Sequence, residues 1–150
     1  MEQLSTRPES LDASVARMAG LWEVLISQAV LFNEGVAKAL GLSTVDLQTF
    51  AVISRNGGPM TPTEVATRTG LPASTTTRVL DRLEQGGYVV RSSVPHDRRK
   101  TAVEVVGAKA AEIAQHYTGK VDQLRRLNAK RTEAELAVVL SYLEELAADG

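Results

Sequence analysis

The stretch from Thr61 to Val105 predicts two short helices followed by a β-hairpin, and this order constrains the fold more than any other feature of the chain. Thr61 is a helix-capping residue that is followed by a proline and, three positions on, by Glu64, the pattern of a capping box. Gly70-Leu71-Pro72 ends this first helix. A second helix begins at Ala73 or Ser74 and ends at Gly86-Gly87. Two helices joined by so tight a turn predict a helix-turn-helix.

The segment after Gly87 predicts the hairpin. Residues 88–91 (Tyr-Val-Val-Arg) are typical of a β-strand, and residues 101–106 alternate apolar with other side chains as a returning strand does. Between them, residues 93–100 form a polar loop that contains Pro95 and ends in Asp-Arg-Arg-Lys. We therefore expect a two-stranded hairpin with a basic tip.

The outer face of the second helix carries groups that suit DNA. Its inner face holds Thr76, Val79, Leu80 and Leu83, while Ser74, Thr75, Arg78 and Arg82 face outward. Hydroxyl groups hydrogen-bond phosphates and base edges, and an arginine such as Arg78 presents two parallel donors to guanine. An ordinary helical hairpin would show a similar pattern, but the basic hairpin that follows favours DNA binding, because arginine suits the negative potential of a narrow minor groove.

The charge distribution agrees with this location. The whole chain has a net charge of only −1, which argues against nonspecific coating of nucleic acid. Residues 61–105 hold seven basic and five acidic side chains, whereas residues 1–60 and 106–150 are each net negative. A basic run of this size is also common in solvated loops, so charge alone does not decide the function.

These motifs resemble the multiple-antibiotic-resistance regulator (MarR) family. The resemblance is carried by residues 74–82 (STTTRVLDR), residues 83–89 (LEQGGYV) and Asp97-Arg98-Arg99 at the hairpin tip. It implies a mainly α (α+β) fold, a winged helix-turn-helix lobe with a two-stranded wing, flanked by N- and C-terminal helices that intertwine in a homodimer. The chain is then one unit over residues 1–150, with the lobe at 43–106 and dimerisation helices at 10–40 and 108–148.

The resemblance also assigns roles to single residues. Residues 74–78 would lie in the major groove, the wing arginines would serve the minor groove or its phosphates, and Asp97 would brace the wing. The DNA-contacting set implied in this way is Ser74, Thr75, Thr76, Thr77, Arg78, Arg82, Arg98, Arg99 and Lys100. Two positions depart from the family pattern. Thr76 replaces a usual valine and brings a hydroxyl that needs a partner, and residues 105–109 lack the threonine that caps the next helix in the family.

The rest of the chain predicts helices. Apolar residues repeat at helical spacing from Leu11 to Leu40, Gly41 ends that helix, and Ser43 or Thr44 caps the next one. A helix is expected from Ala110 to Asn128, and a last one after a second capping box formed by Thr132 and Glu135. No unbroken apolar run is long enough to cross a bilayer and no signal peptide is visible, so the expectations are no membrane contact and a cytoplasmic protein.

Four large side chains are candidates for an effector pocket between the dimer region and the DNA-binding lobe. They are Met18, Trp22, Phe32 and Tyr117. Such a stripe is more often core than pocket. The family resemblance implies a phenolic or other small lipophilic effector, and the absence of cysteine excludes a thiol switch.

Catalysis, cofactors and metals are not expected. The sequence contains no Ser-His-Asp set, glycine-rich phosphate loop or His-Glu-x-x-His motif. His96 and His116 are too few for a zinc site; His96 is expected near phosphate or solvent and His116 in a structural role. The leading hypothesis is therefore a regulator, usually a repressor in this family, on a pseudo-palindromic operator. The alternative is a winged-helix module that binds another protein.

Overall fold

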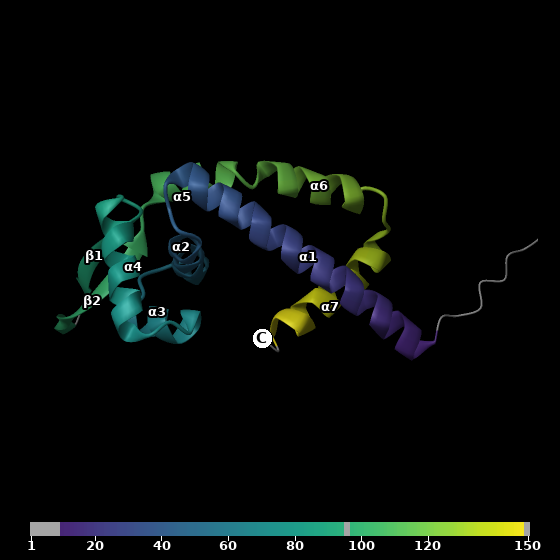
Figure 1. Ribbon diagram of the computed structural model, residues 1–150, viewed down its shortest axis with the longest axis horizontal. Coiled ribbons are helices and arrows are strands. Elements are labelled where there is room, and N and C mark those ends of the chain that lie inside the picture. Colours follow the sequence, from purple (N-terminus) through teal and green to yellow (C-terminus); the bar gives the residue numbers. More distant parts are fainter. Residues whose placement is uncertain (1–9, 95–96, 149–150) are drawn as a thin grey trace, which may run out of the picture. The chain divides into compact units, whose positions relative to one another are not determined.

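A 30-residue helix, α1 (Leu11–Leu40), begins the first of the two units into which the chain divides, residues 1–106 and 107–150 (Figure 1). The computed structural model describes residues 10–94 and 97–148, and it describes the side chains of these residues except 94–100. The Ser10 hydroxyl caps α1 by accepting a hydrogen bond from the Ala13 amide. Gly41, with φ of 68°, ends α1 where the sequence predicted.

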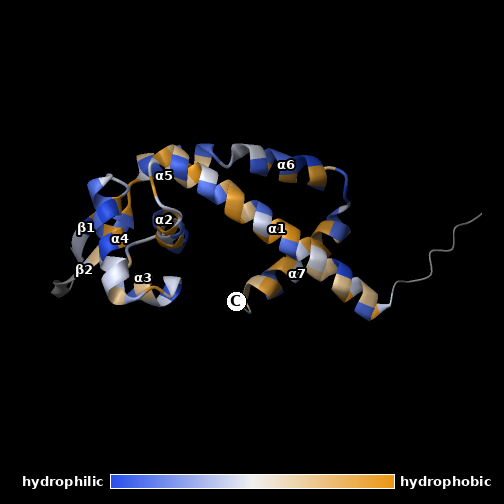
Figure 2. Cartoon of the chain, viewed as in Figure 1, coloured by the Kyte–Doolittle hydropathy of each residue, from blue (hydrophilic) through white to orange (hydrophobic). Residues whose placement is uncertain are grey.

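Most of α1 lies outside any core in this chain. Its buried side chains, Val36 and Ala37, lie in its last two turns, where α2 packs. Large apolar side chains are exposed over the rest of its length, and Figure 2 shows them as hydrophobic bands along the helix. They are Leu11, Val15, Met18, Leu21, Trp22, Val24, Leu25, Ile26, Val30 and Leu31.

This helix also corrects the expectation that nothing in the chain is long and apolar enough to span a membrane. Within the described residues, Leu11–Ala39 meets that test by length and composition. The expectation from the sequence considered only unbroken apolar runs. A helix with few charged residues meets the test of length and composition even when no apolar run within it is unbroken. Helices of soluble proteins also pass the test, so the finding alone does not identify a membrane segment.

Three helices and a hairpin complete the first unit: α2 (Thr44–Asn56), α3 (Pro62–Thr69), α4 (Ala73–Gln85), β1 (Val89–Val94) and β2 (Asp97–Val105). The hairpin is antiparallel, with Val89 opposite Val105 and Ser93 opposite Thr101, and Met60 adds a bridge to Val103. Much of the predicted polar loop at 93–100 is therefore strand. Backbone pairing extends the strands through polar side chains, because it depends on amide and carbonyl groups that every non-proline residue carries.

The core of the first unit lies between α2, α3, α4 and the hairpin. Its fully buried side chains include those predicted for the inner face of α4, namely Thr76, Val79, Leu80 and Leu83. Tyr88 packs edge-on against Phe50, with ring centres 6.1 Å apart, and its hydroxyl donates to the Leu40 carbonyl at 3.2 Å. Tyr88 thus attaches the end of α1 to the core.

The second unit contains α5 (Gly107–Gln115), α6 (Thr118–Asn128) and α7 (Glu133–Ala148). The prediction of one helix over 110–128 was wrong in two ways: the helix begins at Gly107, and it breaks at His116 and Tyr117. Their amides donate to Ile113 and Ala114, three residues back, which tightens the last turn of α5, and the Thr118 hydroxyl bonds the Gln115 carbonyl. Ile113 is the one buried apolar side chain among the described residues of this unit.

The second predicted capping box is confirmed. Glu135 accepts hydrogen bonds from the Thr132 amide at 2.8 Å and hydroxyl at 3.0 Å, and its own amide donates to that hydroxyl at 3.3 Å. The hydrogen bonds from Thr132 lower the pKa of Glu135 from its ordinary value. The cap fixes the start of α7 at Glu133.

Candidate nucleic-acid interface

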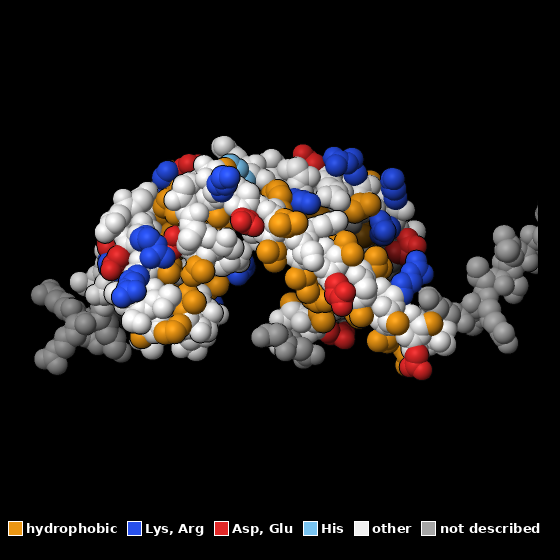
Figure 3. Space-filling model, viewed as in Figure 1, with side chains coloured by type: hydrophobic (Ala, Val, Ile, Leu, Met, Phe, Trp, Pro, Cys, Tyr) orange, Lys and Arg blue, Asp and Glu red, His pale blue; other side chains and the backbone are white. Residues whose placement is uncertain are grey.

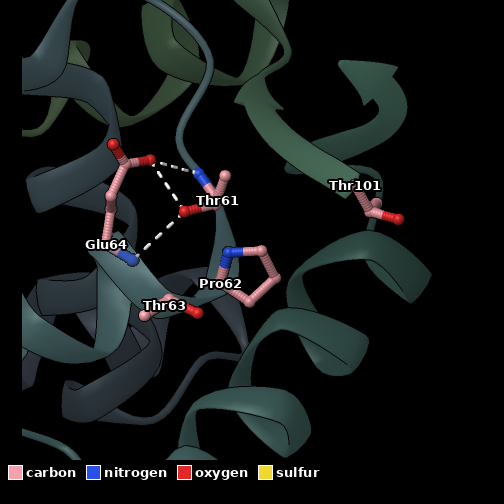
Figure 4. A pocket seen from close by; sticks show the side chains of 5 residues that line it. All are labelled: Thr61, Pro62, Thr63, Glu64 and Thr101. Atoms are coloured by element: carbon pink, nitrogen blue, oxygen red, sulfur yellow. Dashed lines mark hydrogen bonds between the residues drawn. The ribbon is translucent and has the colours of Figure 1, made fainter. Parts of the chain in front are cut away.

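The first helix of the helix-turn-helix begins at the capping box that the sequence predicted. Glu64 accepts from the Thr61 amide at 2.7 Å and the Thr61 hydroxyl at 2.8 Å, and the Glu64 amide donates back at 3.3 Å, as Figure 4 shows. Pro62 lies at the first helical position. This corner and Thr101 of β2 line an open pocket of about 510 Å³, so the start of α3 lies beside the wing.

The turn and the start of α4 follow from glycine and proline. Gly70 adopts a left-handed conformation with φ of 69°, which ends α3 without the strain that a side chain would bring. Pro72 precedes α4, and no side chain caps this helix. The first amides of α4 therefore have no side-chain acceptor, which leaves the positive end of the helix dipole available to an anion.

Thr76 requires a correction within the predicted DNA-contacting set. It is only 1% exposed, and its hydroxyl donates to the Pro72 carbonyl at 3.1 Å. The hydroxyl has therefore found the partner that the sequence required, inside the core. A side chain buried in this way cannot reach a base edge while α4 remains packed.

The remaining small residues and Arg78 form the outer face of α4. Ser74, Thr77 and Arg78 are exposed and Thr75 is half-buried. The Thr77 hydroxyl donates to the Ala73 carbonyl at 3.0 Å, so its oxygen can still accept hydrogen bonds. Ser74 and Arg78 are one helical turn apart and so share one face. The structure thus brings these predicted residues together on one exposed surface.

Arg82 was predicted on the same face, but its guanidinium is held by a carboxylate that the sequence analysis missed. Arg82 Nη2 lies 2.6 Å from Asp46 Oδ1, and its Nε lies 3.2 Å from both carboxylate oxygens. Asp46 is 3% exposed, whereas the Arg82 side chain is 50% exposed. Burial acts to raise the pKa of Asp46, but hydrogen bonds from Arg82 and Ser43 outweigh it, and the pKa is lowered.

The wing is attached to α4 by a second ion-pair cluster. Arg91 of β1 donates from Nη2 to Asp81 at 2.7 Å and from Nη1 to Glu84 at 2.6 Å. The hydrogen bond to Asp81 is the largest of the effects that raise the pKa of Arg91. Sequence reasoning assigned Arg91 only to the basic segment, because the spacing between a strand and a preceding helix does not reveal which carboxylates an arginine reaches.

The wing-tip residues are placed only in part. Asp97, Arg98, Arg99 and Lys100 lie on the β2 backbone, but their side chains are outside the described part of the structure, so their DNA-binding and bracing roles stay predictions. His96 lies outside the described residues. His116 is exposed at the break between α5 and α6, not on a continuous helix face. Among the described residues no cluster of three or more His, Cys, Asp or Glu is arranged to hold a metal.

The four candidate effector-binding residues divide between the two units. Met18 and Trp22 are partly exposed on α1, and Phe32 is half-buried on the same helix. Tyr117 is half-buried in the second unit, and this burial raises the pKa of its hydroxyl. Three pockets in the described part of the chain are lined by other residues. An effector site at these four positions stays a prediction.

Comparison with known proteins identifies related sequences. A family model described as MarR family matches residues 40–100. YcgE of Bacillus subtilis, an uncharacterized HTH-type transcriptional regulator, is 35% identical over 127 residues, which is 85% of this chain and 82% of YcgE. The B. subtilis HTH-type transcriptional repressor YetL is 26% identical over 87 residues, 58% of this chain and 52% of YetL.

Solved structures share the fold. A MarR family protein from Bacillus stearothermophilus superposes with a TM-score of 0.72 at 17% identity, covering 93% of this chain and 97% of that one. A mutant of S. aureus MepR bound to an oligodeoxyribonucleotide gives a TM-score of 0.60 at 13% identity, covering 88% and 96%. The predicted mainly helical fold with a two-stranded antiparallel wing is therefore confirmed.

Proposed function

The chain belongs to the MarR family of DNA-binding transcriptional regulators, and we propose that it acts as a homodimeric repressor on a pseudo-palindromic operator in the cytoplasm. The observation that carries this proposal is the outer face of α4, where Ser74, Thr77 and Arg78 are exposed together. The same helix is tied to the wing through Asp81 and Glu84. Thr63, Thr67 and Arg68 are also exposed on α3. In a helix-turn-helix, however, the second helix is the one that enters the major groove.

The chemistry of this face suits the major groove. Arg78 offers the two donors that guanine O6 and N7 accept, and the threonine methyl groups match the methyl of thymine. Ser74, in the first turn of α4, can donate to a phosphate together with the uncapped amides of that helix. DNA contact is thus assigned to Ser74, Thr75, Thr77 and Arg78, with base readout by Thr75, Thr77 and Arg78, and Thr76 is left to the core.

The wing supplies the second contact in this proposal. Arg98, Arg99 and Lys100 follow one another on β2, and Arg91 ties the adjacent strand to α4. A wing that is fixed to α4, the reading helix, moves with that helix. Cationic side chains at its tip then reach the minor groove or flanking phosphates, where arginine is favoured by the negative potential.

The homodimer is supported by the apolar side chains that the chain leaves uncovered. Besides those of α1, exposed apolar residues occur on α6 (Val121, Leu124 and Leu127) and α7 (Val138, Val139, Leu140, Tyr142, Leu143 and Leu146). Patches of this extent are rare on soluble monomers. A second copy of the same helices would bury them and place two winged lobes on the two halves of a palindrome.

Release by an effector is a further part of the proposal. A small phenolic or lipophilic compound bound near Met18, Trp22, Phe32 and Tyr117 would couple to DNA only if it favours one spacing of the two lobes over another. The apolar character of these residues supports an effector site. Equilibrium dialysis with simple phenolic acids, in the presence and absence of operator, tests whether an effector binds.

A double substitution in the wing tests DNA binding directly. Arg98→Ala/Arg99→Ala should weaken binding to a duplex selected from a random pool at least 10-fold and reduce its salt dependence, because fewer phosphates are neutralised. The control is Arg125→Ala/Arg126→Ala on α6, which removes the same charge outside the lobe. Equal binding by both variants would remove the wing from the mechanism. Salt-independent binding to a protein, with no duplex preference, would instead support the protein-binding alternative.

A further inference from the structure

The reading helix α4 is held from two sides by neighbouring residues of opposite charge. Asp81 binds Arg91 of the wing at 2.7 Å, and Arg82 binds Asp46 of α2 at 2.6 Å. The orientation of α4 is therefore fixed relative to both the wing and α2. The contact with α2 is the less exposed of the two, since the Asp46 side chain is only 4% exposed.

Asp46 uses both carboxylate oxygens. Oδ2 accepts from the Ser43 amide at 3.2 Å as part of the capping box of α2, and both oxygens accept from Arg82. Ser43 follows Gly41, the end of α1, by two residues. One carboxylate thus joins the α1–α2 junction to the helix that faces DNA.

Two arginines one turn apart on α4 differ in their surroundings. Among the described residues, no hydrogen bond or ion pair engages the Arg78 side chain, whereas the Arg82 guanidinium is bound through two nitrogens. An unpaired arginine at position 82 would be half exposed and free to bind any phosphate, which adds affinity without sequence information.

We propose that Asp46 is a positioning residue for sequence discrimination. It keeps the Arg82 guanidinium away from DNA phosphates and fixes the orientation of α4, while Arg78 remains free to contact bases. This inference rests on the proposed DNA-binding function. It reassigns Arg82 from a DNA contact to a brace.

The test compares Asp46→Asn with wild type on two probes, a duplex recovered from a random pool by wild-type selection and a scrambled duplex of equal length and composition. Asparagine keeps the size of Asp46 and an oxygen for the Ser43 amide, but it loses the charge that holds Arg82. We expect the ratio of the two affinities to fall about 10-fold. The plot of log affinity against log salt on the scrambled duplex should steepen by about 0.9, the value for one added phosphate contact.

The matched control is Asp122→Asn, the same change in the exposed Asp122–Arg125 pair of α6. It should leave both the ratio and the slope unchanged. In Asp46→Asn/Arg82→Gln the slope should return to the wild-type value, because no guanidinium is released. A purely structural role for Asp46 would lower both affinities and would not steepen the slope.

A second variant keeps the inference testable if Asp46→Asn does not fold by circular dichroism. Arg82→Gln alone should leave the salt slope at the wild-type value, and a slope shallower by about 0.9 would show that Arg82 contacts phosphate and overturn the inference. An unchanged ratio and slope in folded Asp46→Asn would overturn it as well, with DNA binding intact. A wild type that does not distinguish the two duplexes would contradict the proposed function itself.

Discussion

The winged lobe and the long helices use the same kind of amphipathic pattern with opposite results. Within the lobe, Leu80, Leu83 and Val103 are fully buried by other parts of the same chain. Along α1 and α7, leucines and valines repeat with the same helical spacing but stay exposed. In Figure 3 hydrophobic side chains gather along α1. The lobe is therefore complete in one chain, whereas the helices carry a face that only another surface can cover.

This difference separates two kinds of stability. The lobe should unfold with a free energy that does not depend on protein concentration, because its core is intramolecular. The long helices should depend on concentration if a second copy covers them, since association stabilises by mass action. Substitutions in the two regions can therefore be told apart by how their effects vary with concentration.

The largest effect is expected from a charge placed on the apolar face of α7. Leu143→Glu should weaken the dimer at least 100-fold, because a two-fold interface would bury the unpaired carboxylate twice. Analytical ultracentrifugation should then detect monomer or aggregate. The control is Ser141→Glu, two residues away and so on the opposite face of the helix, which should remain dimeric. A dimeric Leu143→Glu variant would exclude this face from the interface.

A cavity in the lobe should have the next largest effect. Leu80→Ala removes a side chain that is 0% exposed and should lower the free energy of unfolding by about 3 kcal/mol. Leu25→Ala on α1, where the leucine is 58% exposed, should leave the melting of the lobe unchanged and weaken the dimer instead. Urea unfolding at two protein concentrations distinguishes the two outcomes. A concentration-dependent loss in Leu80→Ala would contradict an intramolecular core.

Local signals predicted the lobe well. The cap at Thr61, the turn at Gly70 and the inner face of α4 were all correct, because each depends on residues within about one or two turns of each other. The pairing of Asp46 with Arg82 joins residues that are 36 positions apart, and no spacing rule reveals it. The break at His116–Tyr117 was missed because apolar periodicity continues across it. The backbone changes there to hydrogen bonds that reach three residues back instead of four.

The exposure of α1 shows a different limit. Its apolar stripe was predicted correctly, but periodicity indicates only that a face needs a partner. Whether that partner lies in the same chain depends on tertiary packing, which the pattern does not contain. The family resemblance, rather than the stripe, led to the expectation of a dimer.

The smallest effects compare the two capping boxes, whose geometry is nearly the same in the two regions. Thr61→Ala and Thr132→Ala each remove a hydroxyl that accepts from an amide at 3.3 Å, and each should cost about 1 kcal/mol. In Thr61→Ala the loss should appear in the unfolding of the lobe and be the same at every protein concentration. In Thr132→Ala it should appear as weaker association, because α7 would be stabilised by the second copy in the proposed dimer. Thermal unfolding over a 100-fold range of concentration measures both. If the two variants lost stability equally and without dependence on concentration, α7 would be stable within one chain, and the division between a complete lobe and incomplete helices would not hold.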